Sequence, residues 1–575
     1  METVNELAKR LSRPSTPNKS VDTLWNDWIL WPPNAFGFLS VLLREAALAR
    51  IVVSPPSGCK WPAGLESPAW VRKVAGLGQA WRERTNRLVQ VAVEFKDSKP
   101  GDLPRYRDTV DAVAELSDFF QKVGSVLKRF AKNEFSELRH PKFVRTHWKD
   151  LTLLLEAHAV ADEACGGLGI PGGTPYVWYA IWATDGLTKR HSLASLPVEV
   201  ARVLPKTRVS QNGLSARSLT HHVACLSGPM NVTWSANPFP DGRAGHTDRL
   251  SLLLVPWPEV VRQKFVRPVD SSTDIDRDRF GVFRHEPASG FDIKRLRLLV
   301  QKARGKVDGT LGVVFPEGAL SESEYNEAVA ALRELDVSFI IAGIFEEGED
   351  GCRNVARFEV LARQAKKNRL TVDYDKIHRW AMDPQQVRDF GLQWALSPHV
   401  VWWEDLKLRP PQLSFVGFNR WLSLCVVHAS DLDQLEPIVP VIRSVGPVLV
   451  VALTADGPQL KDRSVGRSAS LLARDPACSI LSLTCLGLTR AHRADRETGD
   501  KRIIALWDEP AAEQRQLGLP DGAPALLLTL CPEFVVEYTA DGRDDGGVAP
   551  RLTLVDHVPI HPANAALPAD RDADV

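Results

Sequence analysis

The sequence contains few cysteines, and no two of them form a CxxC pair. Eight cysteines are scattered singly along the 575-residue chain. A zinc ribbon or a dithiol redox centre needs closely spaced cysteines, so the sequence predicts neither. Scattered single cysteines are typical of a reduced protein in the cytoplasm. We therefore predict a cytoplasmic location, with no metal and no other cofactor.

Long apolar runs and an excess of charge are also missing. No apolar run approaches the length of about 18 residues that indicates a membrane span, and residues 1–20 lack the apolar centre of a signal peptide. Lys plus Arg and Asp plus Glu both number 71, so the formal net charge is zero. This balance argues against a protein that coats a polyanion, although it is compatible with a local basic patch. We expect a globular, multi-domain protein that does not contact a membrane.

Helical periodicity dominates the first part of the chain. Apolar residues recur at helical spacing in residues 31–53, and residues 147–169 form an amphipathic pattern that ends on glycines. Turn residues and short apolar segments follow, with residues 213–226 as a predicted helix. These shifts predict three units: a helical N-terminal region (1–169), a connecting region (170–246) and a third domain (247–565).

Tryptophan is frequent, with 17 in the chain, and many lie in the N-terminal part. An aromatic surface there could bind a protein partner or stack nucleic-acid bases. Core packing of a helical domain is the competing interpretation. The tryptophans concerned are Trp25, Trp28, Trp31, Trp61, Trp70 and Trp81.

From about Arg249 onward, short apolar runs alternate with helical patterns. The clearest strand patterns are residues 309–318, 337–345, 420–428 and 446–454. Near-continuous apolar strands that alternate with helices indicate a parallel or mixed sheet with both faces covered. The fold class predicted for this part is therefore α/β.

Polar residues follow these strands at three positions. Glu317 comes directly after a buried strand pattern, and Lys376 lies between Tyr374 and His378. The third position is VVHASDLDQLE (426–436), where an apolar run stops at His428. Carboxylate, ammonium and imidazole groups at strand ends are candidates for acid–base chemistry.

The order of these positions resembles the nitrilase (carbon–nitrogen hydrolase) superfamily. The matching motifs are FPE (315–317), IIAGIF (340–345), RNVA (353–356) and YxKxH (374–378), and the resemblance spans roughly residues 249–560. It implies an αββα sandwich in the C-terminal half of the chain, preceded here by the mostly α-helical N-terminal region. By analogy it also implies a homodimer.

The resemblance further implies a catalytic trio. Glu317 matches the general base and Lys376 matches the group that stabilises an oxyanion, while a cysteine thiolate attacks an amide or nitrile carbon. In the family an Asp and a Glu follow that cysteine two and seven positions later. Asp431 and Glu436 have this spacing from Ala429, so Ala429 stands at the nucleophile position. A methyl group cannot attack a substrate.

Two other residues could supply a nucleophile. Ser430 is one position further on, and Cys425 lies earlier in the strand pattern, where a thiol is more typical of a small buried hydrophobe. A different register of the motif is a further alternative. His378 and His428 are candidates for the pocket wall, with a structural role as the competing interpretation.

A narrower resemblance concerns the nitrilase-like part together with the helical region before it. The helical N-terminal region together with KIHRW, WWE and DGPQL is similar to nitrilase-like proteins of bacterial antiphage defence, some of which are fused to reverse transcriptases. Their elbow resembles I-C-E-D-L, and this chain has H-A-S-D-L, which keeps Asp431 and Leu432. The chain has no Tyr-x-Asp-Asp motif, so it is not itself predicted to be a reverse transcriptase.

The leading hypothesis is a nitrilase-fold pseudoenzyme that acts as a scaffold or sensor, in the context of antiviral defence. The first alternative is an active amidase or nitrilase that uses Ser430 or Cys425. The second is a protein that binds a protein or nucleic-acid partner through its N-terminal helical region.

Overall fold

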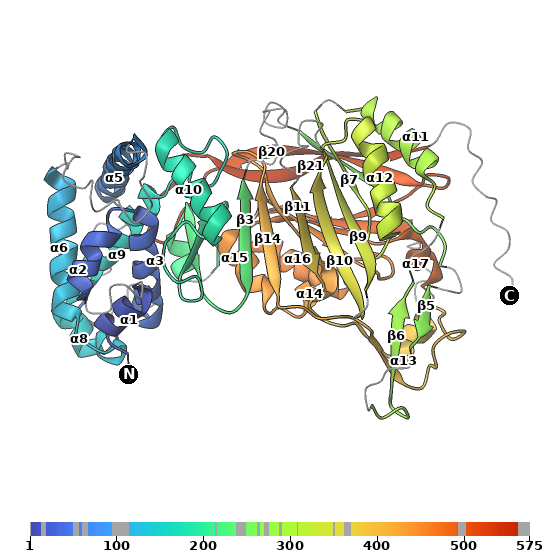
Figure 1. The fold of residues 1–575 in the computed structure, drawn as a ribbon, viewed down its shortest axis with the longest axis horizontal. Helices are drawn as coiled ribbons and strands as arrows, with labels where there is room; N and C mark the ends of the chain where they lie inside the picture. The colour runs from blue at the N-terminus through green and yellow to red at the C-terminus, as the bar shows by residue number, and fades with distance from the viewer. Residues whose placement is uncertain are drawn as a thin grey trace.

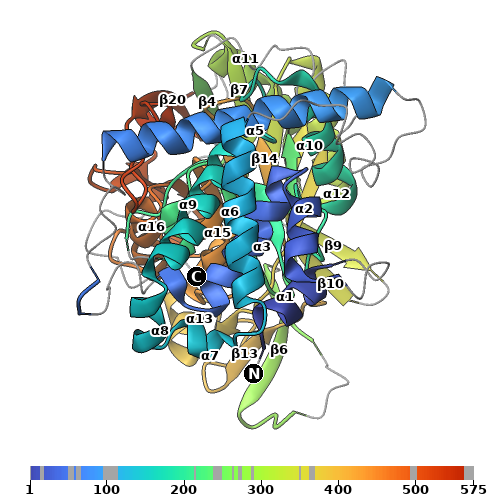
Figure 2. The same cartoon turned by 90° about the vertical axis from the view of Figure 1, so that its left-hand side faces the viewer.

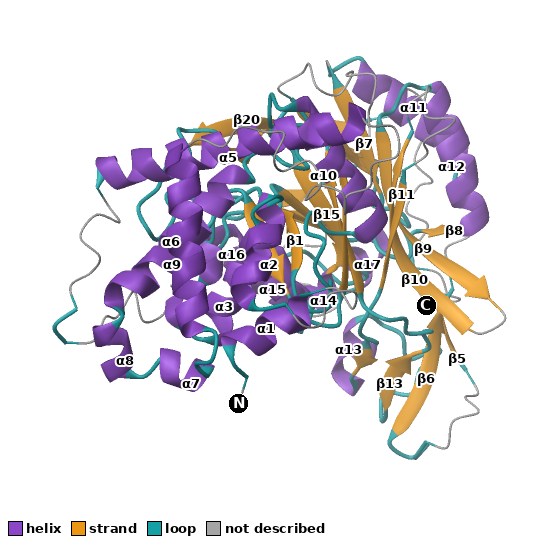
Figure 3. Ribbon diagram, turned by 60° about the vertical axis from the view of Figure 1, so that its left-hand side comes forward, coloured by secondary structure: helices purple, strands orange, loops and turns teal. Residues whose placement is uncertain are grey.

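The computed structural model describes most of the chain. Its residues are 2–12, 19–49, 57–59, 67–94, 114–212, 215–236, 249–261, 265–269, 275–286, 290–307, 309–348, 351–361, 370–492 and 502–561. Parts of the predicted helical patterns, such as residues 50–53, and the predicted domain end at 565 lie outside these ranges. One end of the molecule consists of helices, and the rest combines strands with further helices (Figures 1 and 3).

The N-terminal region is a helical layer that closes one end of the molecule (Figure 2). α3 begins at two prolines, whose fixed backbone angle suits the first helical turn, and it is buried over most of its length. α5 and α9 pack against α3. The helices are α1 (Val4–Leu11), α2 (Val21–Trp28), α3 (Pro32–Glu45), α5 (Pro68–Glu94), α6 (Ala114–Phe130), α7 (Phe135–Leu138), α8 (Pro141–Thr146) and α9 (Trp148–Ala164).

Tryptophans form the core of this helical layer. Trp25, Trp28, Trp31 and Trp81 are all buried. The indole nitrogen of Trp25 donates to the carbonyl of Phe120 at 3.1 Å. The indole nitrogens of Trp31 and Trp81 also donate to backbone carbonyls. These residues therefore stabilise the interior, and the interpretation as an aromatic binding surface is wrong for them.

The connecting region contacts both the N-terminal helices and the third domain. It contains α10 (Val177–Arg190), β1 (Arg202–Pro205), the 3-10 turn η2 (Ala216–Leu219), β2 (Val223–Leu226) and β3 (Asn231–Ala236). The predicted helix over 213–226 is wrong, because β2 pairs antiparallel with β1 and the Asp162 carboxylate accepts the amides of residues 221–223. β3 pairs in parallel with β14 of the third domain, so the boundary at residue 246 divides a sheet.

Two large sheets form the third domain, and the connecting region adds β3 to the second of them. The first has the order β11-β10-β9-β7-β4-β20-β21, with β8 beside β9, and the second has the order β19-β18-β17-β16-β15-β14-β3. The strands of the first sheet are β4 (Leu250–Leu254), β7 (Thr310–Val314), β8 (Leu320–Ser321), β9 (Phe339–Gly348), β10 (Gly351–Val360), β11 (Thr371–Asp375), β20 (Ala525–Val535) and β21 (Ala549–Ile560). The second sheet adds β14 (Gln412–Gly417), β15 (Ser423–His428), β16 (Leu449–Leu453), β17 (Ser479–Leu483), β18 (Ile503–Asp508) and β19 (Arg515–Gly518).

The two sheets pack face to face, and helices cover their outer faces. α11 (Ile293–Arg304) and α12 (Glu322–Glu334) cover the first sheet, while α14 (Ala429–Asp433), α15 (Ile438–Val445) and α16 (Ser464–Arg474) lie on the second; α17 (Leu486–Ala491) follows β17 (Figure 1). Apolar side chains such as Phe339, Phe358 and Phe418 fill the space between the sheets. The predicted mixed α/β class is confirmed.

A small sheet projects from the strand ends of this sandwich. It has the order β12-β13-β6-β5 and is accompanied by α13 (Pro384–Asp389). Its strands are β5 (Val266–Pro268), β6 (Phe280–His285), β12 (Ala381–Met382) and β13 (Val401–Glu404). It carries His285 and Glu404 toward the predicted site.

A turn of the third domain reaches into the helical layer. Arg543, in the connection between β20 and β21, is 1% exposed and donates to Asp162 at 3.1 Å and Glu163 at 2.6 Å on α9. It also donates to the carbonyl of Leu219 at 2.6 Å. A buried arginine held by two carboxylates ties these parts of the chain together.

Within the ranges that the structure describes, no helix has the length and apolar character to cross a membrane.

Candidate active site at the strand ends

Glu317 reaches the site because of a close backbone approach. It follows β7, where the amide of Gly343 on β9 donates to the carbonyl of Pro316 at 3.1 Å. A Cβ atom at residue 343 would lie 2.4 Å from the Cα of Glu317, so the approach requires glycine. This requirement explains the glycine in the IIAGIF motif.

Lys376 lies between two buried carboxylates. Its Nζ donates to Glu317 Oε1 at 2.8 Å and to Glu404 Oε2 at 2.8 Å. Asn354 Nδ2 bridges the same carboxylates, at 2.7 Å from Glu317 Oε1 and 3.2 Å from Glu404 Oε1. The three charged side chains are at most 3% exposed. Their attraction therefore acts in a region that screens charge poorly.

The ion pairing fixes the protonation of both groups. Burial by itself would raise the pKa of Glu317, but the nearby Lys376 and His428 outweigh it and lower that pKa. Burial would likewise lower the pKa of Lys376, and the two carboxylates instead raise it. Glu317 is thus a carboxylate and Lys376 an ammonium ion, and the lowered pKa makes Glu317 a weaker proton acceptor.

Two histidines flank this cluster. His428 Nδ1 lies 3.6 Å from Glu317 Oε1, and His285 Nε2 lies 3.8 Å from Glu404 Oε1. Both rings are buried, and their nitrogens have no hydrogen-bond partner among the described residues. His285 stacks against Phe345 and Trp380, and its burial lowers its pKa.

Asp431 holds the loop that carries Lys376. It is fully buried and accepts hydrogen bonds from Tyr374 Oη at 2.8 Å and from the amides of Ile377 at 3.1 Å and His378 at 3.0 Å. The ring of His378 adds a contact at 2.8 Å. Burial raises the pKa of Asp431, but these hydrogen bonds outweigh it, so the pKa is lowered. Glu436 lies beyond the end of α14 and is exposed, and among the described residues it makes no hydrogen bond or ion pair with the cluster.

The three nucleophile candidates lie in different surroundings. Ala429 is the first residue of α14 and is fully buried. Cys425 lies inside β15, opposite Phe415 and Val450, and its burial raises the pKa of its thiol. The Ser430 hydroxyl is buried without a hydrogen-bond partner in the described part of the chain.

The described hydrogen bonds to the Glu317 carboxylate come from nitrogen donors alone. They are donated by Asn354 and Lys376, and by the amide of Ala455 to Oε2 at 3.0 Å. A general base that activates a thiol or hydroxyl must reach its proton. In this arrangement neither Cys425 nor Ser430 is hydrogen-bonded to Glu317.

Sequence reasoning missed three members of the cluster, namely Asn354, Glu404 and His285. Asn354 belongs to the RNVA motif, and Glu404 ends the WWE motif directly after a tryptophan pair. A glutamate that ends a short aromatic strand is a usable signal, because such a side chain must find a charged partner when it is buried. No comparable signal marks His285.

Comparisons with known proteins add a likeness to solved structures. No family model and no curated protein matches the sequence. A CN-hydrolase superfamily protein from Xanthomonas campestris is similar at 17% identity and a TM-score of 0.24, over 41% of this chain and 76% of that one. Nit3 of Saccharomyces cerevisiae, a member of branch 10 of the nitrilase superfamily, is similar at 12% identity and a TM-score of 0.25, over 55% and 90%.

A glutamine-dependent NAD(+) synthetase from Cytophaga hutchinsonii is also similar, at 10% identity and a TM-score of 0.26. The match covers 49% of this chain and 42% of the synthetase, so it spans less than half of that protein. At these identities the likeness concerns the fold alone.

Proposed function

We propose that this protein is a nitrilase-fold pseudoenzyme that acts as a scaffold or sensor. The observation that supports this proposal best is the state of Glu317. Its carboxylate is engaged by Lys376, Asn354 and a backbone amide, and it has no thiol or hydroxyl among its described hydrogen-bond partners. The elbow residue Ala429 offers only a methyl group.

The retained charges have a structural explanation that does not need catalysis. Lys376 neutralises part of the charge of Glu317 and Glu404 between the strand ends and the small sheet. Removing one partner of a buried ion pair leaves an uncompensated charge, which is strongly destabilising. The cluster can therefore persist as a support for the fold after a nucleophile is lost.

One observation supports the alternative function, an active carbon–nitrogen hydrolase. The buried hydroxyl of Ser430 has no hydrogen-bond partner among the described residues, and Ser430 directly follows the elbow position Ala429. Cys425 has less support, because it lies within the apolar interior between strands. Both remain predictions.

Chemical trapping distinguishes these functions. Wild type and Ala429→Cys are treated with iodoacetamide, which labels thiols, and with a fluorophosphonate, which labels an activated serine, and labelled peptides are mapped by mass spectrometry. Hydrolysis of a panel of small amides and nitriles is measured in parallel. The pseudoenzyme proposal predicts no labelling of the elbow or of Cys425 in the wild type, and no hydrolysis. Labelling of Ser430 or Cys425, or turnover by the wild type that Ser430→Ala or Cys425→Ala abolishes, would overturn it.

The double variant Ala429→Cys/Glu317→Gln is the matched control. If the cradle still suits a nucleophile, Ala429→Cys reacts with iodoacetamide faster than the double variant, because Glu317 accepts the thiol proton. Equal rates in the two variants would show that Glu317 no longer serves as a base.

The biological setting of the proposal is antiviral defence beside a reverse transcriptase, and it rests on the sequence resemblance to defence-associated proteins. A cytoplasmic location is proposed from the scattered single cysteines, and a homodimer by analogy with the nitrilase fold. Phage plating on cells that carry the chain, compared with cells that carry Lys376→Met, tests the first point. Light scattering of the purified protein tests the last.

A further inference from the structure

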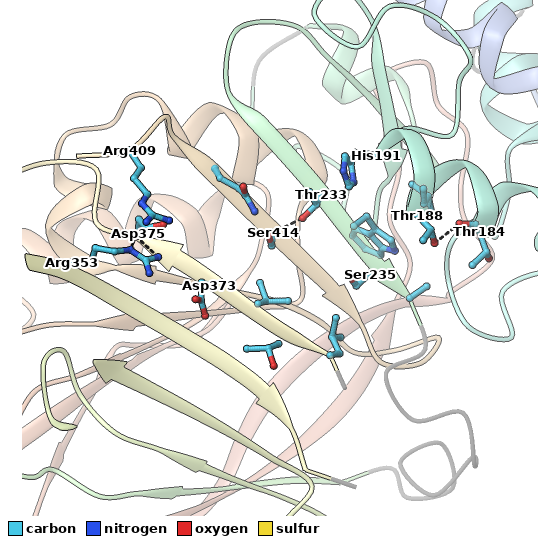
Figure 4. Close-up of a pocket in the computed structure, with 17 residues that line it drawn as sticks. Thr184, Thr188, His191, Thr233, Ser235, Arg353, Asp373, Asp375, Arg409 and Ser414 are labelled. Atoms are coloured by element: carbon cyan, nitrogen blue, oxygen red, sulfur yellow. Dashed lines mark hydrogen bonds and ion pairs between the residues drawn. The ribbon is translucent and has the colours of Figure 1, made fainter. Parts of the chain in front are cut away.

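An open slot lies where the two large sheets end beside α10 (Figure 4). Its volume is about 800 Å³. Thr184 and Thr188 of α10 form one wall, Thr233 and Ser414 belong to the floor, and Asp373 of β11 belongs to the opposite wall. The side chains that define the candidate active site do not line this slot.

The slot exists because the second sheet extends further than the first at the edge formed by β11 and β3. β11 is the end of the first sheet and packs over β14 of the second. The second sheet has one more strand, β3, beyond β14. In the described part of the chain, the first sheet has no strand after β11 that would face β3. A strand added beside β11, at the usual spacing of about 4.8 Å, would lie over β3.

The free edge of β11 offers main-chain hydrogen bonds. The amide of Val360 on β10 donates to Leu370, and the amide of Lys376 donates to Asn354. Alternate residues of an antiparallel pair bond to the partner strand, so the main-chain groups of Thr371, Asp373 and Asp375 point away from β10. In the part of the chain that is described, no other strand pairs with β11. Such an edge is suited to an extended polypeptide.

The charges of the slot favour an acidic side chain. Asp375 accepts from Arg353 Nε at 2.8 Å, and Asp373 accepts from Arg357 Nε at 2.6 Å, so both aspartates are paired with arginines of β10, which also pair with Glu346. Arg409 also lines the slot and is exposed, and it has no ion-pair partner among the described residues. A carboxylate on the bound segment would complement Arg409.

We propose that this slot binds an extended segment of a partner protein, which adds a strand to the free edge of β11 and places an acidic side chain against Arg409. The inference goes beyond the pseudoenzyme proposal and holds whether or not the buried site is active. β11 nevertheless joins the two places, since Tyr374 of the same strand bonds to Asp431 and Lys376 follows the strand directly. A bound segment would stiffen the strand that leads to the buried cluster.

A single amide of β11 provides the test. Thr371 is exposed and its N–H points away from β10, so Thr371→Pro removes one edge donor without breaking the ladder to β10. Thr371→Val keeps the donor and is the matched control. The probes are random 12-residue peptides displayed on phage, selected on the full-length wild type and then synthesised.

The expected peptides carry Asp or Glu, and they slow amide hydrogen exchange at Thr371, Asp373 and Asp375. Their binding should weaken about tenfold or more in Thr371→Pro and in Arg409→Glu, and stay within about threefold in Thr371→Val. If thermal unfolding shows that Thr371→Pro is misfolded, Ser235→Trp, which fills the slot from β3, replaces it with the same expected loss.

Other outcomes overturn the proposal. They are failure to enrich any peptide above a surface without protein, equal binding to the folded Thr371→Pro variant, and exchange protection elsewhere in the chain. Arg409-dependent binding of a 12-nucleotide single-stranded DNA that displaces the peptides would identify the slot as a nucleic-acid site instead.

Discussion

Lys376 Nζ lies 2.8 Å from Glu317 Oε1 and forms with it an ion pair in which both side chains are at most 3% exposed. The second carboxylate, Glu404, approaches the same ammonium group at 2.8 Å from the small sheet. One ammonium ion thus joins the end of β7, the loop after β11 and the end of β13. This contact holds the small sheet against the strand ends of the sandwich.

The first prediction concerns the loss of this ammonium group. Lys376→Met leaves two buried carboxylates without a cation, and we expect the free energy of unfolding to fall by about 3–5 kcal/mol. Urea unfolding followed by tryptophan fluorescence measures the change. Lys189→Met is the control, since it breaks an exposed ion pair with Asp185 and should alter stability little. Equal effects of the two substitutions would contradict the structural role of Lys376.

The second prediction is a dependence of stability on acid. The folded pKa of Glu317 is lowered below the unfolded value of 4.5, so the folded protein binds fewer protons than the unfolded chain below that pH. Glu317 therefore contributes stability that is present above about pH 4.5 and is lost as the pH falls further toward the folded pKa. Lys376, whose folded pKa is raised, loses its contribution only above its unfolded pKa of 10.5.

Comparison with Glu317→Gln isolates this contribution. The wild type should lose more unfolding free energy between pH 6 and pH 3.5 than the variant does, because glutamine does not titrate. Urea unfolding at both pH values gives the two differences. An acid dependence in Glu317→Gln as steep as that of the wild type would assign the effect to other carboxylates.

The third prediction concerns the contact between Asp431 and the loop after β11. Asp431→Ala removes the acceptor for two backbone amides, the Tyr374 hydroxyl and the His378 ring. Buried amides without partners cost about 1–3 kcal/mol each, so we expect a loss of at least about 2 kcal/mol in stability. Hydrogen exchange at Ile377 and His378 should also become faster. Tyr374→Phe, which removes one of the donors, should cost only about 1 kcal/mol.

The sequence predicts the parts of this molecule that depend on local patterns. The capping box of α12, in which Ser321 and Glu324 bond to each other's backbone amides, follows from a serine with a glutamate three residues later. The apolar strands β7, β15 and β16 follow from short buried runs. Motif order then indicates that Glu317 and Lys376 should be neighbours, and the structure places them in contact.

The elements that sequence reasoning missed depend on distant contacts. β2 was read as part of a helix, yet its start is held by the Asp162 carboxylate from α9, far away in the chain. Glu404 and His285 come from short strands of the small sheet, and each finds its neighbours only when that sheet folds against the strand ends. Neither periodicity nor spacing in one sequence encodes such contacts.

The last prediction concerns the junction between the helical layer and the sandwich. Arg543 is fully buried between Asp162 and Glu163 of α9 and donates to the backbone at Leu219. Burial would lower the pKa of Arg543, but the surrounding carboxylates outweigh it and raise that pKa, so the guanidinium is charged at every pH used in practice. Arg543→Met removes this charge and leaves the carboxylates of Asp162 and Glu163 without the arginine that neutralises them.

We expect Arg543→Met to lower the unfolding free energy by about 3–5 kcal/mol and to separate the melting of the helical layer from that of the sandwich. Scanning calorimetry, together with hydrogen exchange in α9 and β20, reports whether the two parts unfold at different temperatures. The double variant Arg543→Met/Glu163→Gln should recover part of the loss, because it removes a carboxylate that the arginine had neutralised. Arg129→Met, which breaks an exposed pair with Asp150, should leave a single transition. One unchanged transition in Arg543→Met would show that apolar contacts alone join the two parts.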